Sequence, residues 1–431
     1  MKRKIAAAGA LIVSATLVLT ACSSGTSSEA SGPATLTVSG WSLQTTPEFQ
    51  VLADGFHEKY PDVTVELKEY DPAEYNTLVT ADLAAGSGPD IITQKEVKYV
   101  TTFKEGGQLL DVSDIELPDG ISGTESYEID GSAYAVPYRQ DSWVLYYDKT
   151  LFDTAGVAYP DGSWTWDDYA DAAEALKAGL TAAGNTAYGA YLHRWQSTVQ
   201  GFASAQAPDA DILSGEFDYL EPYYDRTLSL QDDKAQVDFN TITANQLGYG
   251  SEFGTQKAAM MLMGTWYVGS LTAQQASGEA QDFDWGIAPA PQYDESTTGL
   301  DETPVTFGDP TGFGINANID DSKTQAAKDF LAYAASADAA ERLAEIAITP
   351  ALLDDEVAET FFATPGVPTD ELSRFAVSTH DTKPENPTSS KTAAVQTILG
   401  DLHTGVMSGS ESVSDAVSTA QDRVASEVGT D

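Results

Sequence analysis

The sequence PEFQVLADGFHEKYPDVTVEL, residues 47–67, holds a helix pattern followed at once by a strand pattern. Apolar side chains recur over 46–60 at the spacing of one helix face, and Pro61 should end that helix. Val63-Thr-Val65-Glu-Leu67 then alternates apolar and polar residues, which is typical of a strand. A helix that leads directly into a strand is the repeating unit of an α/β fold.

The flanking segments extend this alternation in both directions. Residues 36–38 have the pattern of an earlier strand, and apolar residues within 75–83 mark a second helix that ends at Gly86-Ser-Gly88-Pro89. A further strand is expected over 90–93. Strand–helix–strand–helix–strand with short connections predicts a mostly parallel sheet with right-handed crossovers.

Sequence patterns typical of helix N-termini occur at three places in the rest of the chain. TWDD at 165–168, SKTQ at 322–325 and SVSD at 412–415 match the spacing of a capping box, and apolar residues with helical periodicity follow each. TKPENPTSS, residues 382–390, is predicted to be a loop because its prolines interrupt regular structure.

Length and composition restrict the class of protein. The chain has 431 residues, 42% of them hydrophobic, and a formal net charge of −44. This length exceeds what one hydrophobic core supports, so at least two domains or lobes are expected. The strong negative charge argues against a nucleic-acid partner, because phosphates would be repelled. Cys22 is the only cysteine, so no disulfide can form within the chain.

The N-terminus reads as a targeting segment rather than as part of the fold. Basic residues at 2–4 precede an apolar run over 5–19, which is too short to cross a ~30 Å hydrocarbon core comfortably. Leu19-Thr-Ala-Cys22 resembles the lipobox of bacterial lipoproteins, in which cleavage precedes the cysteine and its thiol takes a lipid. The resemblance implies a signal peptide over 1–21, lipidation of Cys22 and a flexible tether over 22–33. An ordinary secretory signal with an incidental cysteine is the alternative.

Several enzyme signatures are absent from the sequence. It contains neither a P-loop nor G-x-G-x-x-G after a strand, and no G-x-S-x-G, H-E-x-x-H or EF-hand loop. His57, His193, His380 and His403 are far apart in sequence. The expectation is a protein that is not an enzyme, without a cofactor or a metal. A carboxylate-pair glycan hydrolase stays open as an alternative.

Four segments in fixed order carry a family resemblance. They are AAGSGPDII (84–92), DGSAYAVPYRQDSWVLYYDKTLFDTAGV (130–157), GTQKAAMMLMGTWYVGSL with FDWGIAPAP (254–271 and 283–291), and GFGINANIDDSKTQAAKDFLAYAAS (312–336). Together they resemble the extracellular solute-binding protein family of ATP-driven carbohydrate importers, typified by maltose-binding protein. The resemblance extends over roughly 34–428.

The resemblance implies an α/β, two-lobed periplasmic-binding-protein-like fold of type II, with a hinge of several strands and a ligand cleft between the lobes. The implied N-terminal lobe is 34–139 with 308–348, and the implied C-terminal lobe is 140–307 with 349–431. The chain is expected to cross between them near 138–142, near 303–310 and after Ile348.

Candidate ligand-binding residues follow from this resemblance and from the chemistry of sugars, which need rings for their apolar faces and polar groups for their hydroxyls. Trp266 matches the family's stacking tryptophan, and Asp141 matches an acidic sugar ligand. Gln94 stands where maltose-binding protein carries a tryptophan, and His193 where the family has an acid. The full set is Trp41, Ser42, Gln44, Gln94, Arg139, Asp141, Trp143, His193, Trp195, Trp266, Tyr267, Asp309 and Thr311. Core packing is the competing role for each ring.

The predicted function is a substrate-binding lipoprotein of an ABC importer. It would capture a mono- or oligosaccharide and deliver it to a membrane permease, as a monomer anchored on the extracellular face of the cytoplasmic membrane. A binder of a non-sugar solute such as a polyamine or a peptide, a hydrolase and an adhesin are the alternatives.

Overall fold

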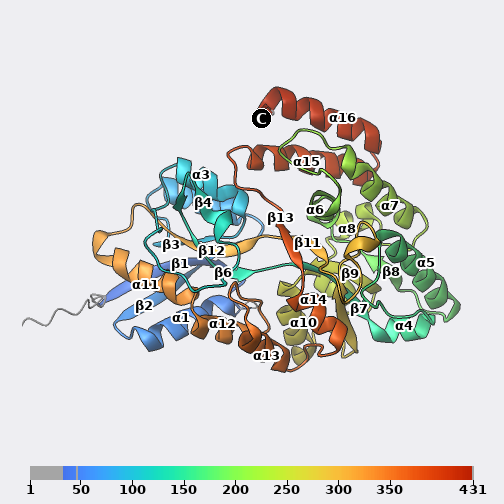
Figure 1. Cartoon of the computed structure of the whole chain (residues 1–431), viewed down its shortest axis with the longest axis horizontal. Coiled ribbons are helices and arrows are strands. Elements are labelled where there is room, and N and C mark those ends of the chain that lie inside the picture. The colour runs from blue at the N-terminus through green and yellow to red at the C-terminus, as the bar shows by residue number, and fades with distance from the viewer. Residues whose placement is uncertain (1–32, 45–46, 430–431) are drawn as a thin grey trace, which may run out of the picture. The chain divides into compact units, whose positions relative to one another are not determined.

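The computed structural model describes residues 33–44 and 47–429 (Figure 1). The predicted signal peptide, Cys22 and all of the tether except Pro33 lie outside the described residues. Two separate hydrophobic cores occur within the described part, and each is built around one sheet. We call these the first lobe, around the five-stranded sheet, and the second lobe, around the four-stranded sheet.

The sheet of the first lobe has the order β2-β1-β3-β12-β6. Its strands are β1 (Ala34–Trp41), β2 (Val63–Tyr70), β3 (Ile91–Gln94), β6 (Val136–Gln140) and β12 (Pro310–Ile315). β1 runs parallel to β2 and β3, whereas β12 runs antiparallel to both β3 and β6. β1, β2, β3 and β6 therefore run in one direction, so the prediction of a mostly parallel sheet is confirmed. β12 is the reversed strand of this sheet, because it enters after an excursion through the second lobe and not after a helical crossover.

Helices cover this sheet as the apolar spacing predicts. Phe49, Leu52 and Phe56 of α1 (Glu48–Lys59) are buried in the first core. The neighbouring helices are α2 (Tyr75–Ala84), α3 (Val100–Glu105), α11 (Thr324–Ala334) and α12 (Ala337–Ala344). The capping box predicted at 322–325 is wrong, because α11 begins after Lys323, which makes no side-chain cap, and Asp320 caps the preceding 3₁₀ turn instead.

The sheet of the second lobe has the order β10-β7-β9-β8, and helices surround it (Figure 1). Its strands are β7 (Trp143–Asp148), β8 (Tyr188–Tyr191), β9 (Ala258–Gly264) and β10 (Trp285–Pro289). Its helices are α4 (Lys149–Ala155), α5 (Trp166–Ala182), α6 (Ser197–Gln206), α7 (Glu221–Asp232), α8 (Phe239–Asn245), α9 (Tyr249–Phe253), α10 (Trp266–Ser277), α13 (Asp355–Ala363) and α14 (Glu371–Ser378). The Thr165 capping box of α5 is confirmed.

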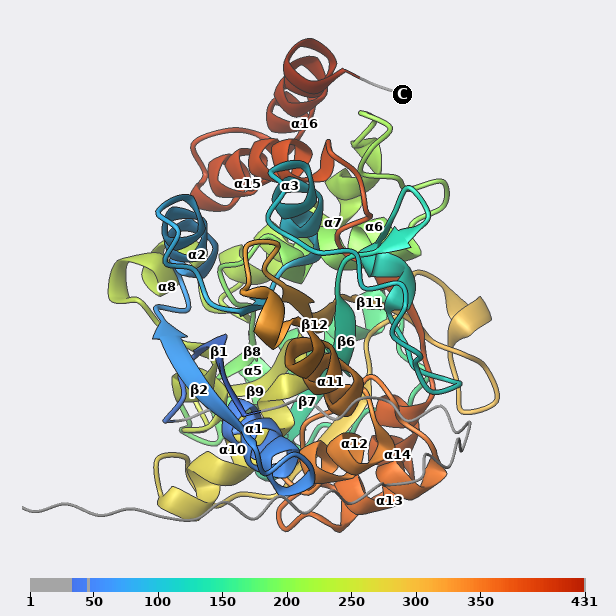
Figure 2. The ribbon, with the colours of Figure 1, turned by 90° about the vertical axis from the view of Figure 1, so that its left-hand side faces the viewer.

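The last helices, α15 (Thr392–Ser408) and α16 (Val413–Arg423), pack on each other near the described C-terminal end (Figures 1 and 2). The Ser412 cap of α16 is confirmed, since its hydroxyl accepts from the Asp415 N–H. The loop predicted over 382–390 begins as a strand, β13 (Asp381–Pro384), which pairs in parallel with β11 (Val305–Gly308). The short hairpin of β4 (Glu128–Ile129) and β5 (Ser132–Ala133) completes the strands of the described residues.

The described chain passes from one hydrophobic core to the other at three places: Asp141-Ser142 between β6 and β7, Asp309 between β11 and β12, and the residues after Ile348. The first two crossings touch. A β-carbon on Gly308 would lie 1.9 Å from the Asp141 carbonyl oxygen, so only glycine fits there. Within the described ranges, no helix has both the length and the hydropathy needed to cross a membrane.

Candidate functional site

A buried ionic cluster lies at the crossing between β6 and β7. Arg139 Nη1 is 2.6 Å from Glu48 Oε2, and Arg139 Nε is 2.9 Å from Asp141 Oδ2. The same guanidinium donates through Nη2 to Thr311 Oγ1 at 3.1 Å. The Tyr138 hydroxyl donates to the other Glu48 oxygen at 2.9 Å. One cation therefore bridges the start of α1, the end of β6, β12 and the crossing.

The charge of this cluster does not cancel, because two carboxylates share one guanidinium. The pKa of Asp141 is raised to about 6, because burial and, to a smaller extent, the charge of Glu48 outweigh the opposing effect of Arg139. The net effect on Arg139 is a raised pKa, because its two carboxylates outweigh the desolvation. The side chains of the predicted ligand residues Arg139, Asp141 and Thr311 therefore form many of their hydrogen bonds and ion pairs with one another.

Thr265 extends this cluster into the second lobe. Its hydroxyl oxygen lies 3.4 Å from Asp141 Oδ1 and accepts from the Ser142 N–H at 3.3 Å. It also lies 2.9 Å from the Thr349 hydroxyl, on the third crossing. A single buried side chain therefore contacts two of the crossings and directly precedes Trp266 in the sequence.

An aromatic cluster follows immediately. We use this name for His193, Trp195, Tyr249 and Trp266. Trp195 lies 4.3 Å from His193, 5.8 Å from Tyr249 and 6.5 Å from Trp266, measured between ring centroids. Trp195 is 39% exposed, although large apolar side chains are usually covered. Rings held at the surface in this way offer apolar faces to a solute.

Gly264, the last residue of β9, determines how Trp266 lies. A β-carbon on Gly264 would fall 1.8 Å from the Trp266 ring, so the indole folds back over the end of the strand. Trp143, on the neighbouring strand β7, holds the indole edge-on with centroids 5.5 Å apart. Trp143 is itself 3% exposed and stacks on Phe307, so it supports the aromatic cluster from the core.

The first lobe presents polar residues at the ends of β1 and β3. Trp41 ends β1 and packs edge-on against Phe49 and Tyr75, and the Lys95 ammonium lies 5.4 Å from its ring centroid. Burial lowers the pKa of Lys95, and the positive charge of Arg139 adds to that effect.

The other predicted residues of the first lobe differ in exposure. Gln94 is 1% exposed, and its Nε2 donates to the Ile92 carbonyl. Ser42, at φ +50°, is half-buried, and Gln44 is exposed.

Asp309 lies apart from the ionic cluster, as a cap for the turn after β13. Its Oδ1 accepts from the N–H groups of Glu385 and Asn386 at 3.0 and 3.2 Å, and its Oδ2 accepts from Asn386 Nδ2. Burial raises the pKa of Asp309 to about 6. Burial and then Asp309 raise the pKa of Glu385 to about 7.

The structure brings some predicted residues together and assigns others to packing. His193, Trp195 and Trp266 share the aromatic cluster, and Arg139, Asp141 and Thr311 share the ionic cluster. Tyr267 is fully buried in the second core, where it packs on Tyr249, and Trp143 is a core residue as well.

Four residues of the two clusters were absent from the predicted set: Glu48, Tyr138, Thr265 and Tyr249. Glu48 looks like an exposed acid in a first helical turn, and Tyr249 belongs to no quoted motif, so no local signal marks either of them.

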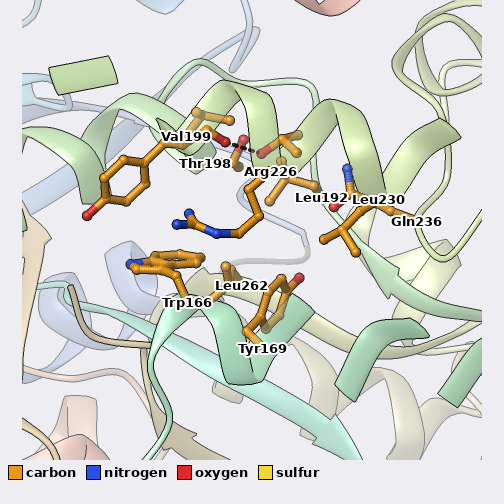
Figure 3. Close-up of a pocket in the computed structure, with 11 residues that line it drawn as sticks. Trp166, Tyr169, Leu192, Thr198, Val199, Arg226, Leu230, Gln236 and Leu262 are labelled. Atoms are coloured by element: carbon orange, nitrogen blue, oxygen red, sulfur yellow. Dashed lines mark hydrogen bonds between the residues drawn. The ribbon is translucent and has the colours of Figure 1, made fainter. Parts of the chain in front are cut away.

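A small cavity in the second lobe is too small for a solute (Figure 3). It measures about 10 Å³, enough for one water molecule. The Arg226 guanidinium lies 5.3 Å from the ring centroid of Trp166 and 5.2 Å from that of Tyr223. The cavity belongs to core packing, as ligand sites measure roughly 300–1,000 Å³. Among the residues that the structure places, no group of three or more His, Cys, Asp or Glu side chains is arranged to hold a metal.

Comparison with known proteins agrees with this architecture. The profile of the family "bacterial extracellular solute-binding protein" matches residues 41–341. A solved structure of a sugar transporter from Rhizobium etli, in an open conformation, is 30% identical with a TM-score of 0.77, over 91% of this chain and 99% of that chain. The melibiose/raffinose/stachyose-binding protein MelE of Bacillus subtilis is 22% identical over 360 residues, covering 80% of this chain and 81% of MelE. The sn-glycerol-3-phosphate-binding periplasmic protein UgpB of Escherichia coli K12 is 30% identical over 168 residues, only 36% of each chain.

This chain therefore belongs to the bacterial extracellular solute-binding protein family. The family resemblance and the two-lobed α/β fold predicted from the sequence are both confirmed.

Proposed function

We propose that this protein is the solute-binding component of an ABC importer and that its solute is a mono- or oligosaccharide. The aromatic cluster carries this proposal. The exposed ring of Trp195 and the half-buried ring of Trp266, beside buried polar groups, suit a ligand with apolar C–H faces and hydroxyl edges. The similarity to MelE, a melibiose/raffinose/stachyose-binding protein, and to the Rhizobium etli sugar transporter supports the same class of solute.

The proposed site lies where the chain crosses between the lobes. Trp41, Ser42, Gln44, Gln94 and Thr311 contribute from the first lobe, and the aromatic cluster contributes from the second. We propose lobes of 34–139 with 308–348 and of 140–307 with 349–431. A solute that touches both lobes only in the closed form shifts the equilibrium toward closure. The closed protein then docks on the permease of its transporter, as a monomer.

The proposed location is the extracellular face of the cytoplasmic membrane, held by a lipid on Cys22 after cleavage of residues 1–21. The lipobox resemblance supports this anchor. A Cys22→Ala variant, expressed in the source bacterium, is expected to move from the membrane fraction to the medium. Retention of that variant on the membrane would contradict the anchor without affecting the sugar proposal.

Titration calorimetry with melibiose, raffinose and maltose tests the solute class. The wild-type protein is expected to bind at least one of them at micromolar concentration, about −8 kcal/mol. Trp266→Ala should weaken that binding at least tenfold, because a stacking face is lost. Tyr293→Ala removes an exposed ring elsewhere in the second lobe and should leave the affinity unchanged. Equal affinity of both variants would remove Trp266 from the site.

The solute is proposed to leave the protein unaltered. Chromatography of the bound saccharide after prolonged incubation should return the starting compound. Cleaved products would favour a glycan hydrolase instead.

A further inference from the structure

The hydrogen-bond network around His193 assigns a tautomer to its ring. The Tyr191 hydroxyl oxygen lies 3.0 Å from the Leu247 carbonyl oxygen and 2.8 Å from His193 Nδ1. A carbonyl oxygen only accepts, so the single hydroxyl proton of Tyr191 goes to Leu247. The Tyr191 oxygen must then accept, and the proton that it accepts belongs to His193 Nδ1.

The other ring nitrogen is consequently an acceptor. With the proton on Nδ1, the neutral imidazole carries a lone pair on Nε2. Burial and then the positive charge of Arg194 lower the pKa of His193 to about 4, which keeps the ring neutral. No protein donor to Nε2 is found within residues 33–44 and 47–429. The ring lies edge-on to Trp195 and Tyr249, with interplanar angles of 84° and 87°.

His403, in the same lobe, provides a comparison, because both of its ring nitrogens form hydrogen bonds within the protein. Its Nε2 lies 3.2 Å from the Arg194 carbonyl oxygen and therefore donates to it. Its Nδ1 lies 3.0 Å from the Tyr224 hydroxyl and, because the proton of the neutral ring is on Nε2, accepts from that hydroxyl. Both nitrogens of His403 are used, with the opposite tautomer. His193 differs because one nitrogen is left for a partner outside the described chain.

We propose that His193 Nε2 accepts a hydrogen bond from the solute, so that the aromatic cluster selects a ligand with a hydroxyl donor beside an apolar face. The same lone pair repels a phosphate or carboxylate oxygen. His193 is thus a specificity-determining residue that favours neutral polyhydroxy solutes over anionic ones. The proposal rests on the function proposed above, because it takes the aromatic cluster as the solute site.

The tautomer is measured first, without any solute. Two-bond ¹⁵N–¹H correlation spectra of the whole protein should show His193 protonated on Nδ1 and His403 protonated on Nε2. Tyr191→Phe, which removes the acceptor for Nδ1–H, should abolish the fixed tautomer of His193 and leave that of His403 unchanged. A proton on His193 Nε2 in the wild-type protein would overturn the proposal, whatever the protein binds.

Binding is then measured for melibiose, raffinose and maltose and for sn-glycerol 3-phosphate as the anionic probe. His193→Phe should weaken the best-bound saccharide about tenfold, and His193→Gln, which keeps an acceptor oxygen, should recover part of the loss. His57→Phe, in the first lobe, is the matched control and should bind as the wild type. Unchanged affinity of His193→Phe, or tighter binding of sn-glycerol 3-phosphate than of any saccharide, would overturn the proposal.

A different result would show that the proposed sugar-binding function is wrong. In that case the wild-type protein binds none of the saccharides while its spectra still show His193 protonated on Nδ1. That result also overturns the role proposed for Nε2.

Discussion

Glu48 and Arg139, 91 residues apart in sequence, form a buried ion pair with 2.6 Å between Oε2 and Nη1. Glu48 is fully buried at the first position of α1, and Arg139 stands one residue before the end of β6. The pair connects the first helix of the first lobe to the segment that leaves it. Removing Arg139 would leave Glu48 and Asp141 as buried carboxylates without a cation, whereas removing Glu48 would leave Arg139 paired with Asp141.

Arg139→Gln should therefore lower the free energy of unfolding by about 3–5 kcal/mol, the cost of leaving buried carboxylates without their cation. Urea denaturation measures it. Glu58→Gln breaks the exposed pair with Arg342 and should cost less than about 1 kcal/mol. Equal losses for the two variants would contradict the distinction between the buried and the exposed pair.

Gly264→Ala should displace the Trp266 indole, because the added methyl group would occupy the position of the ring. We expect a change in tryptophan fluorescence and a weaker affinity for the best-bound saccharide, about tenfold or more. Gly248→Ala serves as the control, since its new methyl group meets nothing closer than 4.0 Å. Wild-type fluorescence and affinity in Gly264→Ala would show that the ring does not depend on this glycine.

His403 should make the protein sensitive to acid. Burial lowers its pKa from the usual 6.5 to about 4, so below pH 6.5 the unfolded chain binds a proton that the folded protein rejects. Stability is therefore expected to fall as pH decreases from about 6.5 to about 4, by up to ~3 kcal/mol from this group.

His403→Gln removes that titration. The difference in unfolding free energy between pH 7 and pH 4.5 should be smaller in the variant than in the wild type, even if the variant is less stable at pH 7. A pH dependence identical to that of the wild type would assign the acid sensitivity to other groups.

The pair Asp309 and Glu385 should act in the opposite direction. Their pKa values are raised to about 6 and about 7, so between roughly pH 4 and pH 7 the folded protein binds protons that the unfolded chain does not hold. Their contribution to stability is expected to grow as pH falls from 8 to 5. Glu385→Gln should reduce this increase in stability at low pH. At pH 8 the variant should be more stable than the wild type by about 1–2 kcal/mol, with a correspondingly higher melting temperature.

Thermal denaturation at pH 8 and pH 5 measures both effects of Glu385→Gln. Glu295→Gln, on an exposed turn, is the control and should leave the difference between the two pH values unchanged. A control that behaves like Glu385→Gln would indicate a general effect of net charge.

Local patterns were enough to predict several helices of both lobes from the sequence. The apolar face of α1 and the caps at Thr165 and Ser412 depend on residues three or four apart, which the chain order displays directly. The direction of β12 was not predictable in this way, because it depends on a return from the other lobe across more than 160 residues. The family resemblance supplied the two-lobed fold, which periodicity alone did not.

The candidate site was only partly visible in the sequence for the same reason. The aromatic residues could be identified from the sequence, and the rings of Trp195 and Trp266 do lie close together in the structure. The burial of Arg139 and Asp141 against Glu48 follows from a contact between distant segments, which no spacing rule marks. The tautomer of His193 depends on the carbonyl of Leu247, 54 residues later in the chain, and a backbone oxygen has no sequence signature.

The contact between Gly308 and the Asp141 carbonyl has a mechanical consequence. Two connecting strands that lie this close cannot slide past each other without a collision, but they can twist together about their shared contact. We expect the relative motion of the lobes to be a swing about this fixed pivot and not a translation. Even the smallest side chain added at position 308 would push the two connecting segments apart. Such a substitution should change how far the lobes open, although it contacts no residue that faces the solute.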